Sequence, residues 1–160
     1  MFACSSVLVE KDSVFQSHAA VGLINKNDIE RFRAHVLATV DEKPTHGFMF
    51  AAVLPRCGTT PPVVLTDDDG EKGAGMRLRS VITSHRSAAH LLRPPPSTPR
   101  KKPLNKKKSH REVKGDHVDD HRQRGGVCVC VTRWYGGVEL GGLRFQLISD
   151  VAKSALDNVP

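Results

Sequence analysis

Long apolar runs, a basic leader and closely spaced cysteine pairs are all missing from this chain of 160 residues. No apolar run approaches the roughly 18–20 residues that a membrane-spanning helix needs, so we expect no membrane association. The first residues, Met1 to Ser6, form neither a basic leader nor a long apolar stretch, which argues against a secretory signal peptide. We therefore expect a cytoplasmic protein.

Cysteine usage points the same way. The four cysteines include no Cys-x-x-Cys pair, which argues against a zinc ribbon or a disulfide scaffold and favours a reducing, intracellular setting. Cys128 and Cys130 alternate with valines in the most apolar strand of the chain, so their side chains share one face of that strand. We expect both thiols to be buried and inert, and we expect no metal and no cofactor.

The basic charge of the protein is concentrated in one stretch. The chain has 24 Lys and Arg against 17 Asp and Glu, a formal net charge of +7. Residues 84–126 hold 12 of the basic and four of the acidic residues, a net charge of +8, whereas the other 117 residues sum to −1. The stretch has only seven apolar residues, too few to offset the entropy of ordering it. We expect a disordered basic insert, 84–126, in a single domain formed by residues 1–83 and 127–160.

Hydrophobic periodicity predicts strands and helices in the order ββαββαβα. We expect strands at residues 6–9, 13–21, 46–54, 63–65 and 127–131, and helices at residues 26–40, 75–83 and 145–156. The apolar run 46–54 indicates a strand covered on both faces, or one covered by helices on the face that matters. The order predicts an α/β (α+β) two-layer sandwich, with a mixed sheet and helices on one face.

The helix at residues 26–40 has the clearest amphipathic pattern. Asn27 and Glu30 have the spacing of a capping pair at its start. Its apolar positions recur every three or four residues and should face the core: Ile29, Phe32, Val36, Leu37 and Val40.

An acidic, glycine-rich turn precedes the second helix. Gly70 and Gly75 have the spacing of a phosphate-binding loop, but Met76 and Arg77 stand where Lys and Ser or Thr are needed, so we reject that motif. Four carboxylates within five residues could attract a hard cation such as magnesium. A solvated acidic turn at the positive end of a helix dipole explains them without metal, and we favour it.

Residues 132–145 carry the most specific information. The only tryptophan and the only tyrosine, Trp134 and Tyr135, stand side by side after the apolar strand. Two glycine pairs, at 136–137 and 141–142, then free the backbone to turn sharply before the last helix.

This segment resembles the hallmark of the IMPACT family, eukaryotic relatives of the bacterial YigZ-type proteins. The hallmark is a strand that ends in an Arg-Trp/Tyr-Tyr/Phe-Gly-Gly turn, followed by Leu-Gly and a helix, here Arg133 to Gly137 with Leu140-Gly141. Three further blocks follow the family's order: Ser13 to His18, Thr45-His46 and the acidic turn Asp67 to Glu71. Trp134 and Arg144-Phe145 are closer to the eukaryotic branch.

The resemblance implies a fold similar to the second domain of a small-subunit ribosomal protein, and a non-catalytic role in regulating translation. Eukaryotic members restrain the general amino-acid control kinase by binding its ribosome-associated activator, and some bind monomeric actin. We expect a monomer. The resemblance implies that its binding residues are the family-motif positions: Phe15, His18, His46, Asp67, Asp68, Asp69, Glu71, Arg133, Trp134, Tyr135, Gly136, Gly137 and Arg144.

Two other functions are kept as alternatives. An enzyme built on the acidic turn and His18 or His46 is the weaker, because the sequence shows no nucleophile beside a base. A nucleic-acid or ribosome-binding module is the stronger, because lysine clusters can neutralise phosphates without reading sequence. The same clusters could also form a nuclear localisation signal or an extended spacer, which we favour. They comprise Lys101, Lys102, Lys106, Lys107 and Lys108.

Overall fold

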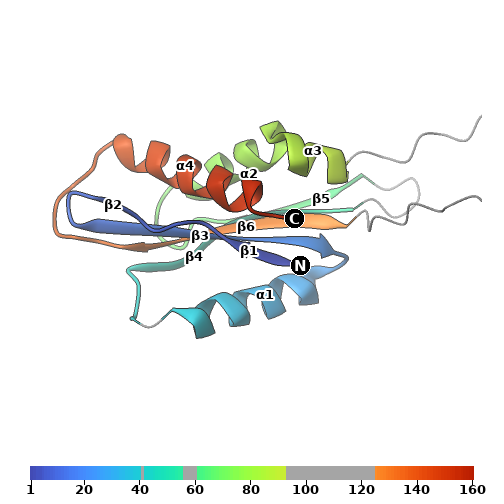
Figure 1. Ribbon diagram of the computed structural model, residues 1–160, viewed down its shortest axis with the longest axis horizontal. Coiled ribbons are helices and arrows are strands. Elements are labelled where there is room, and N and C mark those ends of the chain that lie inside the picture. Colours follow the sequence, from blue (N-terminus) through green and yellow to red (C-terminus); the bar gives the residue numbers. More distant parts are fainter. Residues whose placement is uncertain (41, 56–60, 93–124) are drawn as a thin grey trace, which may run out of the picture.

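The computed structural model describes residues 1–40, 42–55, 61–92 and 125–160 (Figure 1). In chain order the elements are β1 (Phe2–Cys4), β2 (Leu8–Glu10), β3 (Ser13–Leu23), α1 (Lys26–Thr39), β4 (His46–Leu54), β5 (Val63–Asp67), α2 (Ala74–Ser84), α3 (Arg86–Leu92), β6 (Gly126–Trp134) and α4 (Leu143–Asp157). Each predicted element is present within a few residues of its expected position, and β1 and α3 are additional. None of the helices in the described ranges has both the length and the apolarity to cross a bilayer.

The strands form one sheet in the order β1-β3-β6-β4-β5, and β2 pairs with the start of β3. All pairings within the described ranges are antiparallel. β6 lies at the centre, hydrogen-bonded to β3 on one edge and to β4 on the other. Because it has strand neighbours on both edges and helices on both faces, β6 is buried from Gly126 to Arg133.

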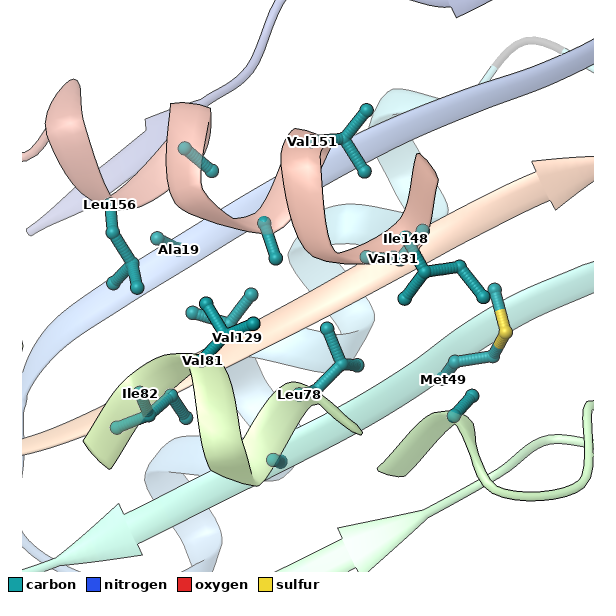
Figure 2. Close-up of a cluster of buried hydrophobic side chains, with 14 of the residues drawn as sticks. Ala19, Met49, Leu78, Val81, Ile82, Val129, Val131, Ile148, Val151 and Leu156 are labelled. Carbon is teal, nitrogen blue, oxygen red and sulfur yellow. The ribbon is translucent and has the colours of Figure 1, made fainter. Parts of the chain in front are cut away.

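Helices cover both faces of this sheet (Figure 1). On one face, Leu78 and Ile82 of α2 and Ile148 of α4 close over the β6 valines (Figure 2). On the other face, Phe32 and Val36 of α1 belong to a second apolar cluster, together with residues of β3, β4 and β6. The two clusters are separated by the sheet, because successive side chains of a strand point to opposite faces.

The valine–cysteine alternation of β6 follows this division. Its three valines belong to the cluster under α2 and α4, whereas Cys128 and Cys130 belong to the cluster under α1. Both thiols are completely buried. The predicted burial of both cysteines is confirmed, and it raises the pKa of both thiols above the ordinary value.

The predicted mixed α/β class is confirmed, and two of its details differ. The structure is a three-layer arrangement, with α1 on the face opposite α2, α3 and α4 (Figure 1), and its sheet is antiparallel rather than mixed. The apolar run of β4 explains the extra layer, because a strand that is apolar on both faces needs a cover on both. The relative direction of the strands could not be predicted from local sequence patterns, because β3 and β6 pair although they are more than 100 residues apart in the sequence.

Two expectations about α1 are corrected at its ends. Its N-cap is Asn25, whose side chain accepts a hydrogen bond from the Asp28 backbone, and Asp28 closes the capping box. The Asn27–Glu30 pair has the same spacing but lies within the helix, which begins at Lys26. Leu37 is 43% exposed rather than part of the core, because the buried stripe consists of Ile29, Phe32 and Val36.

The disordered insert predicted at residues 84–126 was given too early a start, because a helix lies within its first residues. Residues 86–92 form α3, and Ala88 is 1% exposed in the cluster under α2 and α4. Gly125 and Gly126 are also part of the packed domain, since a Cβ on Gly125 would lie 2.2 Å from Gly22 Cα. The lysine clusters at Lys101, Lys102 and Lys106 to Lys108 lie outside the described residues.

Candidate functional site

A buried carboxylate, Glu71, joins two arginines that come from distant parts of the chain. Glu71 lies in the turn between β5 and α2, Arg133 lies near the end of β6, and Arg144 lies in the first turn of α4. Glu71 Oε2 accepts a hydrogen bond from Arg133 Nη1, and Glu71 Oε1 accepts one from Arg144 Nε at 2.6 Å. Such charge-assisted bonds are strong, so the acidic turn is fixed against β6 and α4.

Arg133 is held between two aromatic rings. Its guanidinium carbon lies 5.3 Å from the Phe15 ring centre and 5.4 Å from the Tyr135 ring centre. Phe15 is the direct cross-strand partner of Arg133, so both side chains point to the same face of the sheet. The arginine is 5% exposed, and its Nε donor is buried without a hydrogen-bond partner among the described residues.

His46, at the start of β4, lies beside the Glu71 carboxylate. Its Nδ1 lies 2.6 Å from the Asp69 carbonyl oxygen, and its Nε2 lies 3.8 Å from Glu71 Oε2. Because a carbonyl oxygen can only accept, Nδ1 carries the hydrogen in this bond. The imidazole ring is thereby oriented with its second nitrogen toward the Glu71 carboxylate.

The glycine turn after β6 has two separate causes. A Cβ on Gly136 would lie 2.1 Å from the Asp12 carbonyl carbon, so the two backbones approach too closely for any side chain. Gly137 instead has a φ of +86°, in the left-handed region, with open space around it. The predicted sharp turn is confirmed at both positions.

Thr45 fixes the position of Tyr135 at the start of this turn. The Thr45 backbone N–H donates to the Arg133 carbonyl oxygen at 2.9 Å, and its hydroxyl accepts from the Tyr135 backbone N–H at 3.0 Å. Tyr135 therefore stays above Arg133 while 44% of the residue remains exposed.

These groups border a hollow of about 480 Å³ on the surface. Its lining combines one buried carboxylate, two arginines, an imidazole, an exposed aromatic ring and the glycine-rich loop before α4. In full, the lining residues are Thr45, His46, Glu71, Arg133, Tyr135, Glu139, Leu140, Gly141 and Arg144. We refer to this feature below as the arginine hollow.

The other carboxylates of the acidic turn bind backbone amides. Asp68 accepts from Gly73 and Gly75 at the start of α2, at 2.9 and 2.8 Å, as an acidic group at a helix N-terminus does. Asp69 Oδ2 accepts from Phe48 N at 2.9 Å, and Asp67 Oδ1 accepts from Asp69 N at 2.8 Å. Within the described ranges, no three His, Cys, Asp or Glu side chains are arranged to hold a metal ion.

Two of the predicted site residues lie on the opposite face of the sheet. His18 is three positions from Phe15 along β3, and Trp134 directly follows Arg133 on β6, so strand alternation directs both away from the hollow. Trp134 Nε1 donates to the Glu42 carbonyl oxygen at 3.2 Å. His18 lies in cross-strand register with Cys4 and Cys130, and burial lowers the pKa of its imidazole, with a smaller contribution from His35.

Four lining residues were not predicted as site residues. Thr45 adjoins His46 in one of the motif blocks, so its side chain could have been included on that ground. Glu139, Leu140 and Gly141 belong to the glycine-rich segment, but no local pattern shows that this segment folds over Glu71. That contact depends on a long-range approach of the acidic turn to β6 and α4, which sequence spacing does not encode.

Comparison with known proteins gives a family match and a structural similarity. The family model of the Impact N-terminal domain matches residues 117–156. A solved structure of the two-domain translational regulator Yih1 is similar at 23% sequence identity and a TM-score of 0.45. That alignment covers 98% of this chain and 46% of the Yih1 chain, so this chain spans about half of that protein. No curated protein matches.

Proposed function

We propose that this chain is a member of the IMPACT family and a non-catalytic regulator of translation that acts by binding a protein partner. The observation that carries the proposal is a coincidence of two findings. The segment that matches the family model, residues 117–156, also supplies Arg133, Tyr135 and Arg144 to the arginine hollow. The residues by which the family is identified therefore include three of those that line the arginine hollow.

The chemistry of the hollow favours binding over catalysis. Glu71 is buried and bonded to two guanidinium groups, so both of its carboxylate oxygens already have hydrogen-bond partners within the protein. The buried thiols of Cys128 and Cys130 belong to the opposite face, and their raised pKa values keep them as weakly nucleophilic thiols.

The rim of the hollow has the composition of a protein-binding surface. Tyr135 is half-exposed above Arg133, Val138 is exposed in the same loop, and Leu143 is exposed at the first position of α4. Exposed tyrosine beside arginine is typical of the few residues that dominate binding energy at interfaces. By the family resemblance, the partner is the ribosome-associated activator of the general amino-acid control kinase, and the site of action is the cytoplasm.

Capture of a purified fragment of that activator by the immobilised full chain tests the proposal. We expect Tyr135→Ala to weaken capture at least about tenfold, as loss of a central interface residue does. Ile24→Ala is the matched control, because Ile24 is 73% exposed and lies between β3 and α1, away from the hollow. Equal capture by wild type and Tyr135→Ala would contradict the proposed contact surface. The same comparison with monomeric actin tests the second partner that the resemblance implies.

A ribosome or RNA contact through the basic stretch is the second candidate, favoured by its net charge of +8 against −1 for the rest of the chain. Affinity carried by lysine–phosphate contacts should fall steeply as salt rises. Alanine at Lys101, Lys102, Lys106, Lys107 and Lys108 should weaken RNA binding and flatten its salt dependence, while capture of the activator persists. Tight, salt-insensitive RNA binding by this variant would instead place the RNA contact on the folded domain.

A further inference from the structure

We propose that the arginine hollow binds an oxyanion, a phosphate or a carboxylate group, against Arg133 and Arg144. The proposal rests on the proposed function only in that both concern the same surface. Anion binding is measured on the protein alone, so its failure is distinguishable from a failure to capture the activator.

The first argument is the number of donors. A guanidinium group has five N–H donors and no acceptor. Glu71 accepts one bond from each arginine, and Arg144 Nη1 donates a further bond to the Gly141 carbonyl oxygen. The Nε of Arg133 is buried and has no partner among the described residues. A buried donor of a charged group is costly without an acceptor, and both arginines line the hollow with more N–H donors than the described residues supply with acceptors.

The second argument is the balance of charge. Two guanidinium groups face one buried carboxylate, which leaves the floor of the hollow with an excess positive charge. The opposing group is Glu139, which lines the hollow but is exposed. An exposed charge is screened by water and salt far more than a buried one. Arg133 and Arg144 therefore determine the preferred ligand charge, and Glu139 weakens the preference.

The third argument is space. The hollow measures about 480 Å³, which is more than a single phosphate or carboxylate group fills. A Cβ added to Gly141 would meet nothing within 4 Å, so the loop backbone borders open space. The exposed ring of Tyr135 forms a side wall next to Arg133. This geometry suits an oxyanion carried on a larger group whose flat or apolar part lies against the tyrosine.

The chain provides a local probe for the experiment. Trp134 and Tyr135 are its only tryptophan and tyrosine, so intrinsic tryptophan and tyrosine fluorescence comes from two adjacent residues at the end of β6. We would titrate the full chain at constant ionic strength with inorganic phosphate, acetate and phenyl phosphate. We expect a saturable change with a midpoint on the order of 1 mM for the best ligand.

Three single substitutions test whether the charged groups of the hollow determine the midpoint. Arg144→Gln should raise the midpoint at least about tenfold, because a charge-assisted hydrogen bond is lost. Arg77→Gln is the matched control: it removes the same charge, and Arg77 contacts the same Phe145 ring that Arg144 contacts, but it lies outside the hollow. Its midpoint should stay within about twofold of wild type. Glu139→Gln should lower the midpoint by about two- to fivefold, since it removes the opposing charge.

The outcomes separate the sources of the ligand. Tighter binding of phenyl phosphate than of inorganic phosphate identifies a group carried on a larger ligand, and equal binding identifies the free ion. Preference for acetate identifies a carboxylate. No saturable change with any of the three, or equal weakening by Arg77→Gln and Arg144→Gln, overturns the proposal. If Arg144→Gln fails to fold by circular dichroism, Glu139→Gln decides, because an unchanged or raised midpoint in that variant also overturns it.

Discussion

The two faces of the sheet are both covered by helices, and the face under α2 and α4 ends in the charged arginine hollow. At the end of β6, Arg133 turns toward Glu71 and Phe15, whereas its neighbour Trp134 turns toward the Glu42 backbone on the α1 side. Residues that adjoin in the sequence thus take part in different structures. Because successive side chains of a strand point to opposite faces, one part of this motif lines the hollow and the other part packs on the α1 side.

The α1 face shows the contrasting solution for polar residues. His18 is buried in register with Cys4 and Cys130, and burial lowers its imidazole pKa. On the other face, Glu71 and Arg133 are equally buried but compensate each other. Charge is thus kept inside the domain where a partner is present, and the neutral form is favoured where none is.

The strongest way to break this contrast is to remove the shared carboxylate. Glu71→Leu leaves Arg133 buried without its ion partner, and we expect a loss of about 3–5 kcal/mol in the free energy of unfolding, as found when one member of a buried pair is removed. Cys130→Ala on the α1 face is the comparison, with an expected loss of about 1 kcal/mol. Guanidinium chloride unfolding measures both. Similar losses would mean that the two faces do not differ in this way.

The turn that leads from β6 to the hollow is the second target. Gly136→Val should cost about 3 kcal/mol, because its side chain would overlap the Asp12 backbone, which cannot move without disrupting the β2–β3 hairpin. Gly137→Ala should cost only about 1 kcal/mol, since it meets open space and opposes only the positive φ. The difference between the two is read from denaturant midpoints at equal m-values. A larger cost at Gly137 would contradict the close backbone approach at Gly136.

Local patterns predicted the elements of this fold better than their arrangement. β4 was predicted at its observed limits, and Ile29, Phe32 and Val36 were correctly assigned to the buried face of α1, because each signal lies within one element. The third layer and the antiparallel sheet were not predicted, since both depend on pairings between distant segments. The short strand β1 was not predicted either, and its place in the sheet comes from its pairing with β3.

The candidate site was predicted in part for the same reason. Four sequence blocks identified Glu71, Arg133, Tyr135 and Arg144, and the fold brings these residues together. His18 and Trp134 were included because they share those blocks, although strand alternation places them on the other face. Deciding between the faces requires knowing which face of the sheet the acidic turn reaches, and that is a property of the tertiary structure.

Two deletions test whether α3 contributes to the apolar cluster under α2 and α4. Replacing residues 93–124 by a glycine–serine linker of about ten residues should shift Tm by no more than about 5 °C, because the cost of loop closure changes slowly with length. Removing residues 84–126 should lower Tm further, since it deletes α3 with its buried Ala88 and the first residue of β6. Differential scanning calorimetry compares the two. Equal values would show that α3 contributes nothing to the core.

The smallest expected effect concerns pH and the α1 face. Since the pKa of His18 is lowered in the folded protein, the unfolded chain binds more protons around and below the ordinary value of about 6.5. The free energy of unfolding is therefore not reduced by His18 at neutral pH. It falls as pH decreases through that value, by no more than about 1.4 kcal/mol per pH unit for a single proton. His18→Leu should remove this part of the slope between pH 7 and pH 5, whereas His90→Gln, at an exposed position on α3, should leave it intact. His35→Gln should reduce the slope slightly, because His35 contributes less to the shift than burial does. Denaturant unfolding at three pH values gives the slopes. An unchanged slope in His18→Leu would show that burial does not lower the pKa of this imidazole.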